Sequence, residues 1–139
     1  MEYAIELASN IHKSEVPISA IIAIDDNIIS CAENRVERDS IEWHHAEFLA
    51  VKQAIQNLNV KYLNNASIYI TLEPCIFCSS LLDRIRIKEI YFGSYSPKQS
   101  SLTKCLHLLD YISKNTVIIG GLYDNRCFQL IKQFFHNLR

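Results

Sequence analysis

Hydrophobic and polar positions along the chain predict helices that alternate with strands after an opening hairpin. Apolar residues recur at helical spacing in residues 2–13, which predicts an amphipathic helix that lies on a sheet and is ended by Pro17. Residues 18–24 and 28–33 flank the turn Asp25-Asp26-Asn27 and predict the two strands of a hairpin. The first of these strands is almost unbroken in its apolar character, so we expect it to be covered on both faces.

The same alternation continues downstream. Residues 45–58 carry two apolar stripes, which predicts a helix buried on more than one side. A further helix is expected from Pro74 to about Arg84, because proline is favoured at the first helical position. The remaining expected elements are a polar connection at 34–40, strands at 67–72, 87–92 (ended by Gly93) and 116–119 (ended by Gly120-Gly121), a short helix near 102–111, and a C-terminal helix with Cys127, Ile131, Phe134 and Leu138 on one face. This order predicts an α/β fold with a mixed sheet and helices on its faces.

Length and composition are typical of one globular domain over residues 1–139. The N-terminus lacks the features of a signal peptide, and no apolar run approaches the ~20 residues of a membrane helix, so we expect a cytoplasmic protein without a membrane partner. The net charge of −1 gives no general argument for nucleic-acid binding, so binding to RNA would need a local basic surface. Five cysteines in such a chain favour metal ligands or buried thiols over disulfides, and burial is the expectation for Cys31, Cys105 and Cys127.

Two short motifs carry the candidate chemistry. Cys75 and Cys78 lie three residues apart after Pro74, and His45 lies upstream with Glu47 two residues on. Two thiols and one imidazole make three of the four ligands of a tetrahedral zinc ion, and catalytic zinc sites leave the fourth position open for water. Both motifs fall where a helix is expected to begin, at the kind of strand-to-helix end where sites form in such folds. Glu47 could then reach the water without binding the metal.

Other interpretations of these motifs were weighed. A Cys-x-x-Cys pair alone could be a redox pair, but that interpretation leaves His45 and Glu47 unexplained. A structural zinc site needs a fourth ligand, which His44 could supply. We therefore favour a catalytic zinc site, with His44 as a neighbouring or surface residue and His12, His107 and His136 as ordinary helix or loop histidines.

The combined pattern resembles the His-x-Glu…Pro-Cys-x-x-Cys motif of the zinc-dependent nucleobase deaminases. Within this superfamily the chain is most similar to the bacterial tRNA-specific adenosine deaminases. The similar stretches, in the same order over nearly the whole chain, are Val16-Pro17-Ile18, Glu33-Asn34-Arg35, His45-Ala46-Glu47, Tyr69 to Cys75, Ile90 to Gly93 and Gln133-Phe134-Phe135. The resemblance implies a cytidine-deaminase-like fold of three layers, α/β/α, with a mixed five-stranded sheet, and a homodimer.

The resemblance also implies a function. Adenosine at the wobble position of a tRNA anticodon loop would be converted to inosine with release of ammonia. By position, His45, Cys75 and Cys78 would bind one Zn²⁺ per subunit, and Glu47 would move the protons. Asn34 would hydrogen-bond the flipped nucleotide, although on spacing alone an ordinary turn asparagine is equally compatible with that position.

One segment departs from the family pattern. The loop that meets the RNA usually reads Arg-Asp-x-Lys-Thr-Gly, whereas Gly93 to Gln99 keeps only the lysine, as Lys98, and has Ser96 in place of the acidic residue. The zinc chemistry is unaffected, but a deaminase of a free base or nucleoside, such as guanine, cytosine or cytidine, stays open as the alternative function. A non-catalytic zinc domain that acts as an interaction partner is a third hypothesis.

Overall fold

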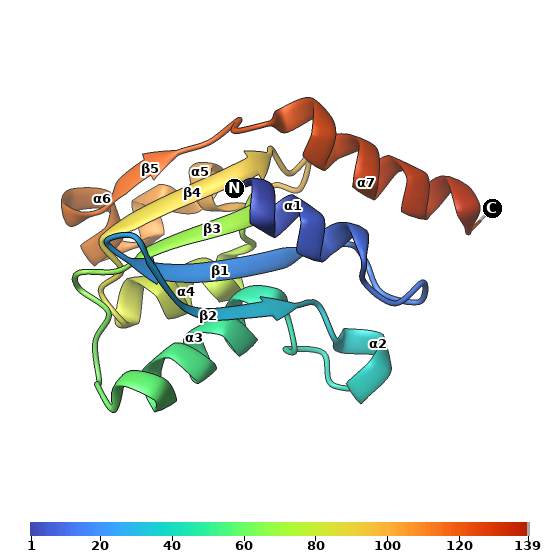
Figure 1. The fold of residues 1–139 in the computed structure, drawn as a ribbon. Coiled ribbons are helices and arrows are strands. Elements are labelled where there is room, and N and C mark those ends of the chain that lie inside the picture. Colours follow the sequence, from blue (N-terminus) through green and yellow to red (C-terminus); the bar gives the residue numbers. More distant parts are fainter. Residues whose placement is uncertain (139) are drawn as a thin grey trace.

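The computed structural model describes residues 1–138 and shows a five-stranded sheet between two layers of helices (Figure 1). The strands are β1 (Ser19–Ile24), β2 (Asn27–Glu33), β3 (Ser67–Leu72), β4 (Glu89–Ser94) and β5 (Val117–Ile119). They lie in the order β2-β1-β3-β4-β5. β1 pairs antiparallel with β2 and with β3, whereas β3–β4 and β4–β5 are parallel. The predicted hairpin, mixed sheet and three layers are therefore confirmed.

The helices cover both faces of this sheet. The long helices are α1 (Glu2–Ser9), α3 (Ala46–Leu58), α4 (Ile76–Arg84) and α7 (Asp124–Asn137). α1 and α7 lie over one face, and α3 and α4 lie over the other (Figure 1). The shorter elements are α2 (Val36–Asp39), α5 (Leu102–Cys105), the 3-10 helix η1 (Leu106–Leu108) and α6 (Asp110–Asn115).

The core lies between the sheet and the layer formed by α3 and α4. Ile22, Ile68, Ile70 and Phe92 from three strands are fully buried and belong to a single cluster of core residues. Three alanines of α3 at helical spacing are also fully buried, which lets this helix approach the strands closely: Ala46, Ala50 and Ala54. The second apolar stripe that the periodicity predicts on α3 is only partly buried. The helix is therefore fully buried along one stripe and partly buried along the other, so the predicted burial on more than one side is incomplete.

The first helix is shorter than predicted, because it ends at Ser9 and Pro17 does not terminate it. The Ser9 hydroxyl donates to the Ile5 carbonyl at 2.7 Å, and the Asn10 amide donates to the Glu6 carbonyl at 2.9 Å. Short polar side chains that bond nearby carbonyl groups compete with the helical pattern. The helix therefore stops one turn before the sequence pattern suggests.

Gly93 does not end β4, contrary to the prediction, because the strand continues through Ser94. A Cβ atom at this position would lie 2.3 Å from the Cys127 Sγ atom of α7 and 2.6 Å from the Thr71 carbonyl oxygen. The glycine is required for this close approach between β4, β3 and α7 rather than for a turn.

Several boundaries also differ in the less regular segments. The polar connection contains the single turn α2, and the short helix expected near 102–111 is divided into α5, η1 and α6. Of the expected inner face of α7 only Cys127 is buried, and Leu138 is 64% exposed. The last turns of α7 extend beyond the sheet (Figure 1). Cys31 and Cys105 are half-buried rather than buried, and all five cysteines are free.

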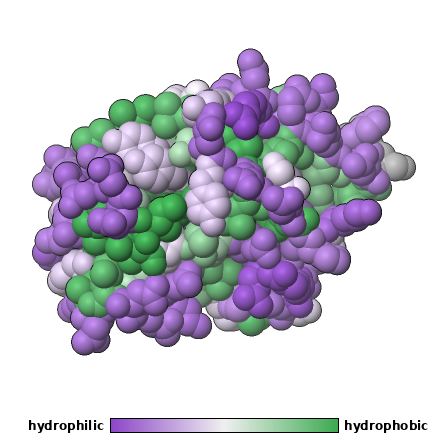
Figure 2. Space-filling view, in the orientation of Figure 1, coloured by the Kyte–Doolittle hydropathy of each residue, from purple (hydrophilic) through white to green (hydrophobic). Residues whose placement is uncertain are grey.

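Apolar side chains are also present on the surface of the side covered by α1 and α7. Hydrophobic surface gathers over β5 and over the part of the sheet that these two helices leave uncovered (Figure 2). Val117 and Ile119 of β5 are among the exposed large hydrophobic residues. Within residues 1–138, no helix combines the length and the apolar character needed to cross a membrane.

Candidate metal centre and active site

His45, Cys75 and Cys78 come together at the end of β3, where the predicted metal ligands were expected to meet. The His45 Nδ1 atom lies 3.7 Å from the Cys75 Sγ atom and 3.4 Å from the Cys78 Sγ atom. One ligand atom from each of the three residues lies within 4.8 Å of the other two. Residues 30 positions apart in the sequence are thus gathered by the pairing of strands and the packing of α3 beside α4.

Two helix starts position these ligands. His45 is the residue before α3 and has an extended backbone, with φ −65° and ψ 152°. Cys75 is likewise the extended residue before α4, with φ −71° and ψ 167°. Pro74 therefore precedes the helix instead of opening it, which corrects the predicted start. Cys78 is the third residue of α4, so the Cys-x-x-Cys spacing joins the residue before the helix to its first turn.

The spacing of the three ligand atoms fits zinc. A tetrahedral ion with Zn–S bonds of about 2.3 Å and a Zn–N bond of about 2.0 Å holds sulfur and nitrogen about 3.5 Å apart. The two sulfur–nitrogen distances, 3.4 and 3.7 Å, bracket this value. Two thiols and one imidazole are also a donor set that zinc prefers.

The thiol pair already favours a thiolate without a metal. The Cys78 thiol and the His45 imidazole hydrogen-bond the Cys75 sulfur and lower the pKa of Cys75 to about 4. The same Cys75 sulfur, together with burial, raises the pKa of Cys78. The pair therefore shares one proton, and a zinc ion would displace it, because both sulfurs bind as thiolates.

Glu47 lies beside this ligand set, as predicted. Its side chain is only 5% exposed, and burial raises its pKa to about 7. The charge of Cys75 also raises the pKa of this carboxyl and that of His45 lowers it, so Glu47 lies within electrostatic reach of the ligand cluster. Two residues two positions apart in mid-helix point about 200° apart, but His45 lies outside α3 and Glu47 inside it, so this separation does not apply to them.

His44 is not a fourth ligand. Its Nδ1 atom lies 2.7 Å from the Asp39 carboxylate, and its ring stacks on Phe48 at 6.1 Å between centroids. His44 hydrogen-bonds Asp39 and thereby lowers the pKa of that carboxyl, and Arg35 adds to the effect. Within residues 1–138 the metal-binding group has only three members. A closed structural zinc site is therefore not supported, whereas an open fourth position is.

Asn34 is held by a carboxylate that sequence reasoning missed. Glu15 is completely buried, and it accepts hydrogen bonds from the Asn34 Nδ2 atom at 3.0 Å and from the Arg38 backbone N–H at 2.6 Å. A carboxylate can only accept, so the amide nitrogen of Asn34 must face it and the amide oxygen must point elsewhere. The signal in the sequence was a lone acidic residue directly before the apolar run of β1.

Lys98 has an exposed side chain whose charge acts on the His45 imidazole. The hydrogen bond that His45 donates to the Cys75 sulfur raises the pKa of His45, whereas the charge of Lys98 lowers it. Phe77 meets the His45 ring edge-on, with centroids 6.1 Å apart, and is 47% exposed. An exposed aromatic ring thus lies next to the imidazole.

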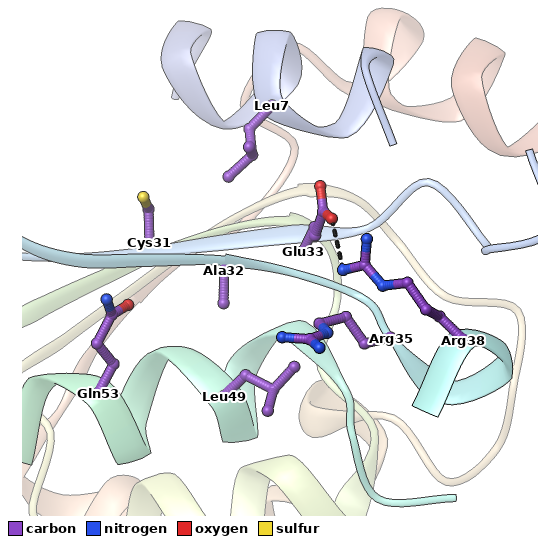
Figure 3. A pocket seen from close by; sticks show the side chains of 8 residues that line it. All are labelled: Leu7, Cys31, Ala32, Glu33, Arg35, Arg38, Leu49 and Gln53. Atoms are coloured by element: carbon purple, nitrogen blue, oxygen red, sulfur yellow. Dashed lines mark hydrogen bonds and ion pairs between the residues drawn. The ribbon is translucent and has the colours of Figure 1, made fainter. Parts of the chain in front are cut away.

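An open pocket lies elsewhere, between α1, β2 and α3 (Figure 3). It encloses about 370 Å³ and is lined by Leu7, Cys31, Ala32, Glu33, Arg35, Arg38, Leu49 and Gln53. Arg38 pairs with Glu33 at 2.8 Å and Arg35 pairs with Asp39 at 3.0 Å. The pocket includes none of the metal ligands, and both of its guanidinium groups are already paired. The candidate active site is therefore identified by the three metal-binding residues and not by this pocket.

Comparison with known proteins agrees with this geometry. The family model of the cytidine and deoxycytidylate deaminase zinc-binding region matches residues 1–94, which include all three metal ligands and Glu47. The chain belongs to this family of zinc-dependent deaminases. The prediction of a hydrolytic zinc deaminase is thereby confirmed, and the redox interpretation of Cys75 and Cys78 is not supported.

Individual deaminases resemble the chain over most of its length. A tRNA-specific adenosine deaminase of Aquifex aeolicus is 38% identical over 128 residues, which cover 91% of this chain and 85% of that protein. A structure from a study of A-to-I editing by tRNA:A34 deaminases at the wobble position of transfer RNA is 27% identical, with a TM-score of 0.84 over 94% of this chain and 96% of that one. The predicted cytidine-deaminase-like fold is confirmed by this match. A guanine deaminase from Nitrosomonas europaea, 18% identical with a TM-score of 0.80 over 96% of this chain and 81% of that one, shares the fold.

Proposed function

We propose that this protein is a tRNA adenosine deaminase, which hydrolyses adenosine at the wobble position of an anticodon loop to inosine and ammonia. The observation that supports this substrate best is the 38% identity to a tRNA-specific adenosine deaminase over 91% of the chain. The guanine deaminase has the same fold at 18% identity, so the fold alone does not choose the substrate. The chemistry itself rests on the three metal ligands and the buried carboxyl beside them.

In this proposal His45, Cys75 and Cys78 hold one zinc ion per subunit. The chemistry that bound zinc supplies is to lower the pKa of a water molecule toward neutrality. Two thiolates balance the charge of the ion and a neutral imidazole adds none. The start of α4 favours the thiolate at Cys75, the residue before the helix, because the unpaired N–H groups there stabilise negative charge and the Cys78 backbone N–H helps to lower the pKa of Cys75.

Glu47 is the proton carrier in this mechanism. It accepts one proton from the attacking water and gives it to the purine ring nitrogen. It then takes the remaining proton from the new C6 hydroxyl and passes it to the amino group, so that the C6–N bond breaks, ammonia leaves and the C6 carbonyl of inosine forms. The burial of this carboxyl and the action of the Cys75 and His45 charges on it support this role. Burial also keeps competing bulk water away from these transfers. General acid–base catalysis by a positioned group of this kind contributes ~10²–10⁴-fold in rate.

Asn34 and Lys98 are the proposed substrate contacts. With one amide hydrogen of Asn34 directed to Glu15, the amide oxygen is available to accept a hydrogen bond from the flipped nucleotide. Lys98 would meet a phosphate of the anticodon loop, a role that its exposed position and the effect of its charge on His45 support. Exposed Phe77 could stack on an unpaired base, a contact that single-stranded RNA commonly makes with proteins.

A substrate panel tests the proposal. Purified zinc-loaded protein is incubated with an anticodon stem-loop that has adenosine at the wobble position, and in parallel with guanine, cytosine, cytidine and adenosine. We expect inosine in the stem-loop and no ammonia from the free compounds, with activity that falls steeply as salt is added, because phosphate contacts are salt-sensitive. Ammonia from a free base at a salt-independent rate would instead establish the alternative substrate.

The oligomeric state and the cellular location are part of the same proposal. We treat residues 1–139 as one deaminase domain that forms a homodimer in the cytoplasm. A shallow pocket of about 340 Å³ between α3 and α4 supports the dimer, because its lining is largely apolar: Phe48, Val51, Lys52, Ile55, Gln56 and Leu81. Light scattering should give twice the chain mass of 16.0 kDa, and Ile55→Asp should shift the protein toward the monomer.

A further inference from the structure

The segment 95–101, called here the site loop, connects β4 to α5 and carries Lys98. It contains neither helix nor extended strand, and residue 101 makes a single antiparallel bridge to Cys75. A loop without regular structure has no internal ladder to fix its shape. The position of Lys98 must therefore depend on contacts that residues outside the loop make with it.

Glu73 makes the main contacts of this kind, and it lies two residues before the metal ligand Cys75. Its side chain is only 3% exposed. One carboxylate oxygen accepts the Ser96 backbone N–H at 2.9 Å, and the other accepts the Thr103 backbone N–H at 2.8 Å and the Thr103 hydroxyl at 2.6 Å. A single carboxylate thus joins the beginning of the site loop to Thr103, two residues beyond the end of the loop.

The start of α5 shows that this carboxylate replaces an ordinary helix cap. Ser101 precedes α5, where a serine hydroxyl normally accepts an N–H of the first turn. That N–H, of Thr103, is instead bonded to Glu73, and the Ser101 hydroxyl is buried without a hydrogen-bond partner among the described residues. The Thr103 N–H thus bonds a carboxylate 30 residues away in the sequence, in the metal-binding turn, instead of the neighbouring serine hydroxyl.

Further bonds join the same two segments. The Ile76 N–H donates to the Ser100 carbonyl at 2.7 Å, and the Leu102 N–H donates to the Pro74 carbonyl at 2.9 Å. On the outer side, the Lys104 ammonium donates to the Ser96 carbonyl at 3.1 Å and to the Lys98 carbonyl at 3.0 Å. Hydrogen bonds therefore hold the site loop near both of its ends, and Lys98 lies between these ends.

We propose that Glu73 is a positioning residue for substrate binding, and that Lys104 assists it by holding the site loop, and with it Lys98, against the metal-binding turn. The proposal rests on the proposed function, since it assumes that Lys98 meets the RNA. It adds a role for two residues that touch neither the metal nor the reacting base.

The carboxylate form is needed because both of its oxygens must accept hydrogen bonds. Glu73→Gln keeps the shape of the side chain but turns one oxygen into an NH₂ group, which would face either the Ser96 N–H or the Thr103 N–H. Two donors then oppose each other, and one edge of the site loop is released. Lys104→Met removes the outer bonds at an exposed position, where a loss of folding is not expected.

The test measures kinetics on the wobble-adenosine stem-loop together with amide hydrogen exchange. For Glu73→Gln we expect KM to rise about tenfold, the free-energy equivalent of one lost hydrogen bond to a charged group. The value of kcat should stay within about threefold and the zinc content at one per chain. Exchange should accelerate at the Ser96 amide or at the Thr103 amide, whichever faces the new NH₂ group. Lys104→Met should give a smaller rise of KM in the same direction, and Lys104→Arg, which keeps a cationic donor, should restore part of it.

Two comparisons separate positioning from general damage. Asp110→Asn removes an exposed carboxylate on α6 and should leave all these quantities unchanged. If Glu73 acts through Lys98, then Glu73→Gln combined with Lys98→Gln should raise KM no further than Lys98→Gln alone. Additive KM effects, or a parallel loss of kcat, zinc and thermal stability, would overturn the proposal.

The exchange measurement also distinguishes this inference from the proposed function. If the wild-type protein does not act on the stem-loop, the proposed substrate is wrong, but unchanged exchange at Ser96 and Thr103 in Glu73→Gln would separately overturn the role of Glu73. If the wild-type protein is active and Glu73→Gln matches it in KM, the inference fails while the function stands.

Discussion

The two sides of the candidate site are built in different ways. The metal ligands belong to the frame of the fold, since His45 and Cys75 each precede a helix and Cys78 lies in the first turn of one. The substrate side, by contrast, is an irregular loop whose place depends on hydrogen bonds from Glu73 and Lys104. The metal ligands are thus positioned by secondary structure, whereas the loop proposed to meet the substrate is positioned by a few side chains. Such an arrangement lets the loop differ from the family pattern, as at Ser96, while the metal ligands keep their positions.

The largest expected effect falls on the metal side. Cys75→Ala removes one of three protein ligands, so the purified variant should hold much less than one zinc per chain and show no measurable turnover. Metal analysis and the stem-loop assay check this expectation. Cys31→Ala, a half-buried cysteine outside the ligand set, is the matched control and should keep both zinc and activity.

Next in size is the loss of the proton carrier. Glu47→Gln should lower kcat by ~10²–10⁴-fold, because the amide cannot accept and return protons, while zinc stays bound. The measurement is kcat beside zinc content for the same preparation. Normal turnover with full zinc would refute the assigned mechanism, and it would revive a non-catalytic zinc domain.

On the loop side we expect changes in binding more than in chemistry. Lys98→Gln should raise KM for the stem-loop about tenfold, leave kcat within about threefold, and reduce the slope of log KM against log salt concentration by about 0.7, the value for one phosphate contact to a single strand. Lys114→Gln, an exposed lysine on α6, should change none of these quantities. An unchanged salt slope for Lys98→Gln would show that Lys98 does not meet a phosphate.

The smallest effect should come from one bond at the edge of the loop. Thr103→Val removes the hydroxyl that donates to Glu73 at 2.6 Å but leaves the backbone N–H bond in place. We expect a loss of about 0.5–1.5 kcal/mol in the free energy of unfolding, measured by urea denaturation. Thr103→Ser keeps the hydroxyl, so equal losses in the two variants would mean that the bond to Glu73 is not the cause.

The sequence predicted what depends on local pattern and left out what depends on distant contacts. Strand β3 was predicted with its observed bounds, and the three ligands were predicted because the two thiols three residues apart and the His-x-Glu pair are short local motifs of zinc-binding residue types. Gly93 was misjudged, because its role depends on Cys127, which lies 34 residues away and belongs to α7. Glu15 and Glu73 were missed for the same reason: their partners lie 19 to 30 residues away, and no periodicity records such bonds.

The end of the first helix illustrates a second limit. Its apolar spacing continues to Ile11, yet Ser9 and Asn10 bond carbonyl groups of the last turn and stop the helix. Periodicity reports which face of a helix is apolar, whereas the end of a helix is decided by individual polar side chains.

The most direct test of the proposed function is a map of inosine in a full-length tRNA with adenosine at the wobble position, after treatment with the zinc-loaded protein. We expect one inosine, at the wobble position, formed by the wild-type protein and absent after treatment with Glu47→Gln. Inosine at scattered positions, or none with one zinc bound per chain, would contradict it.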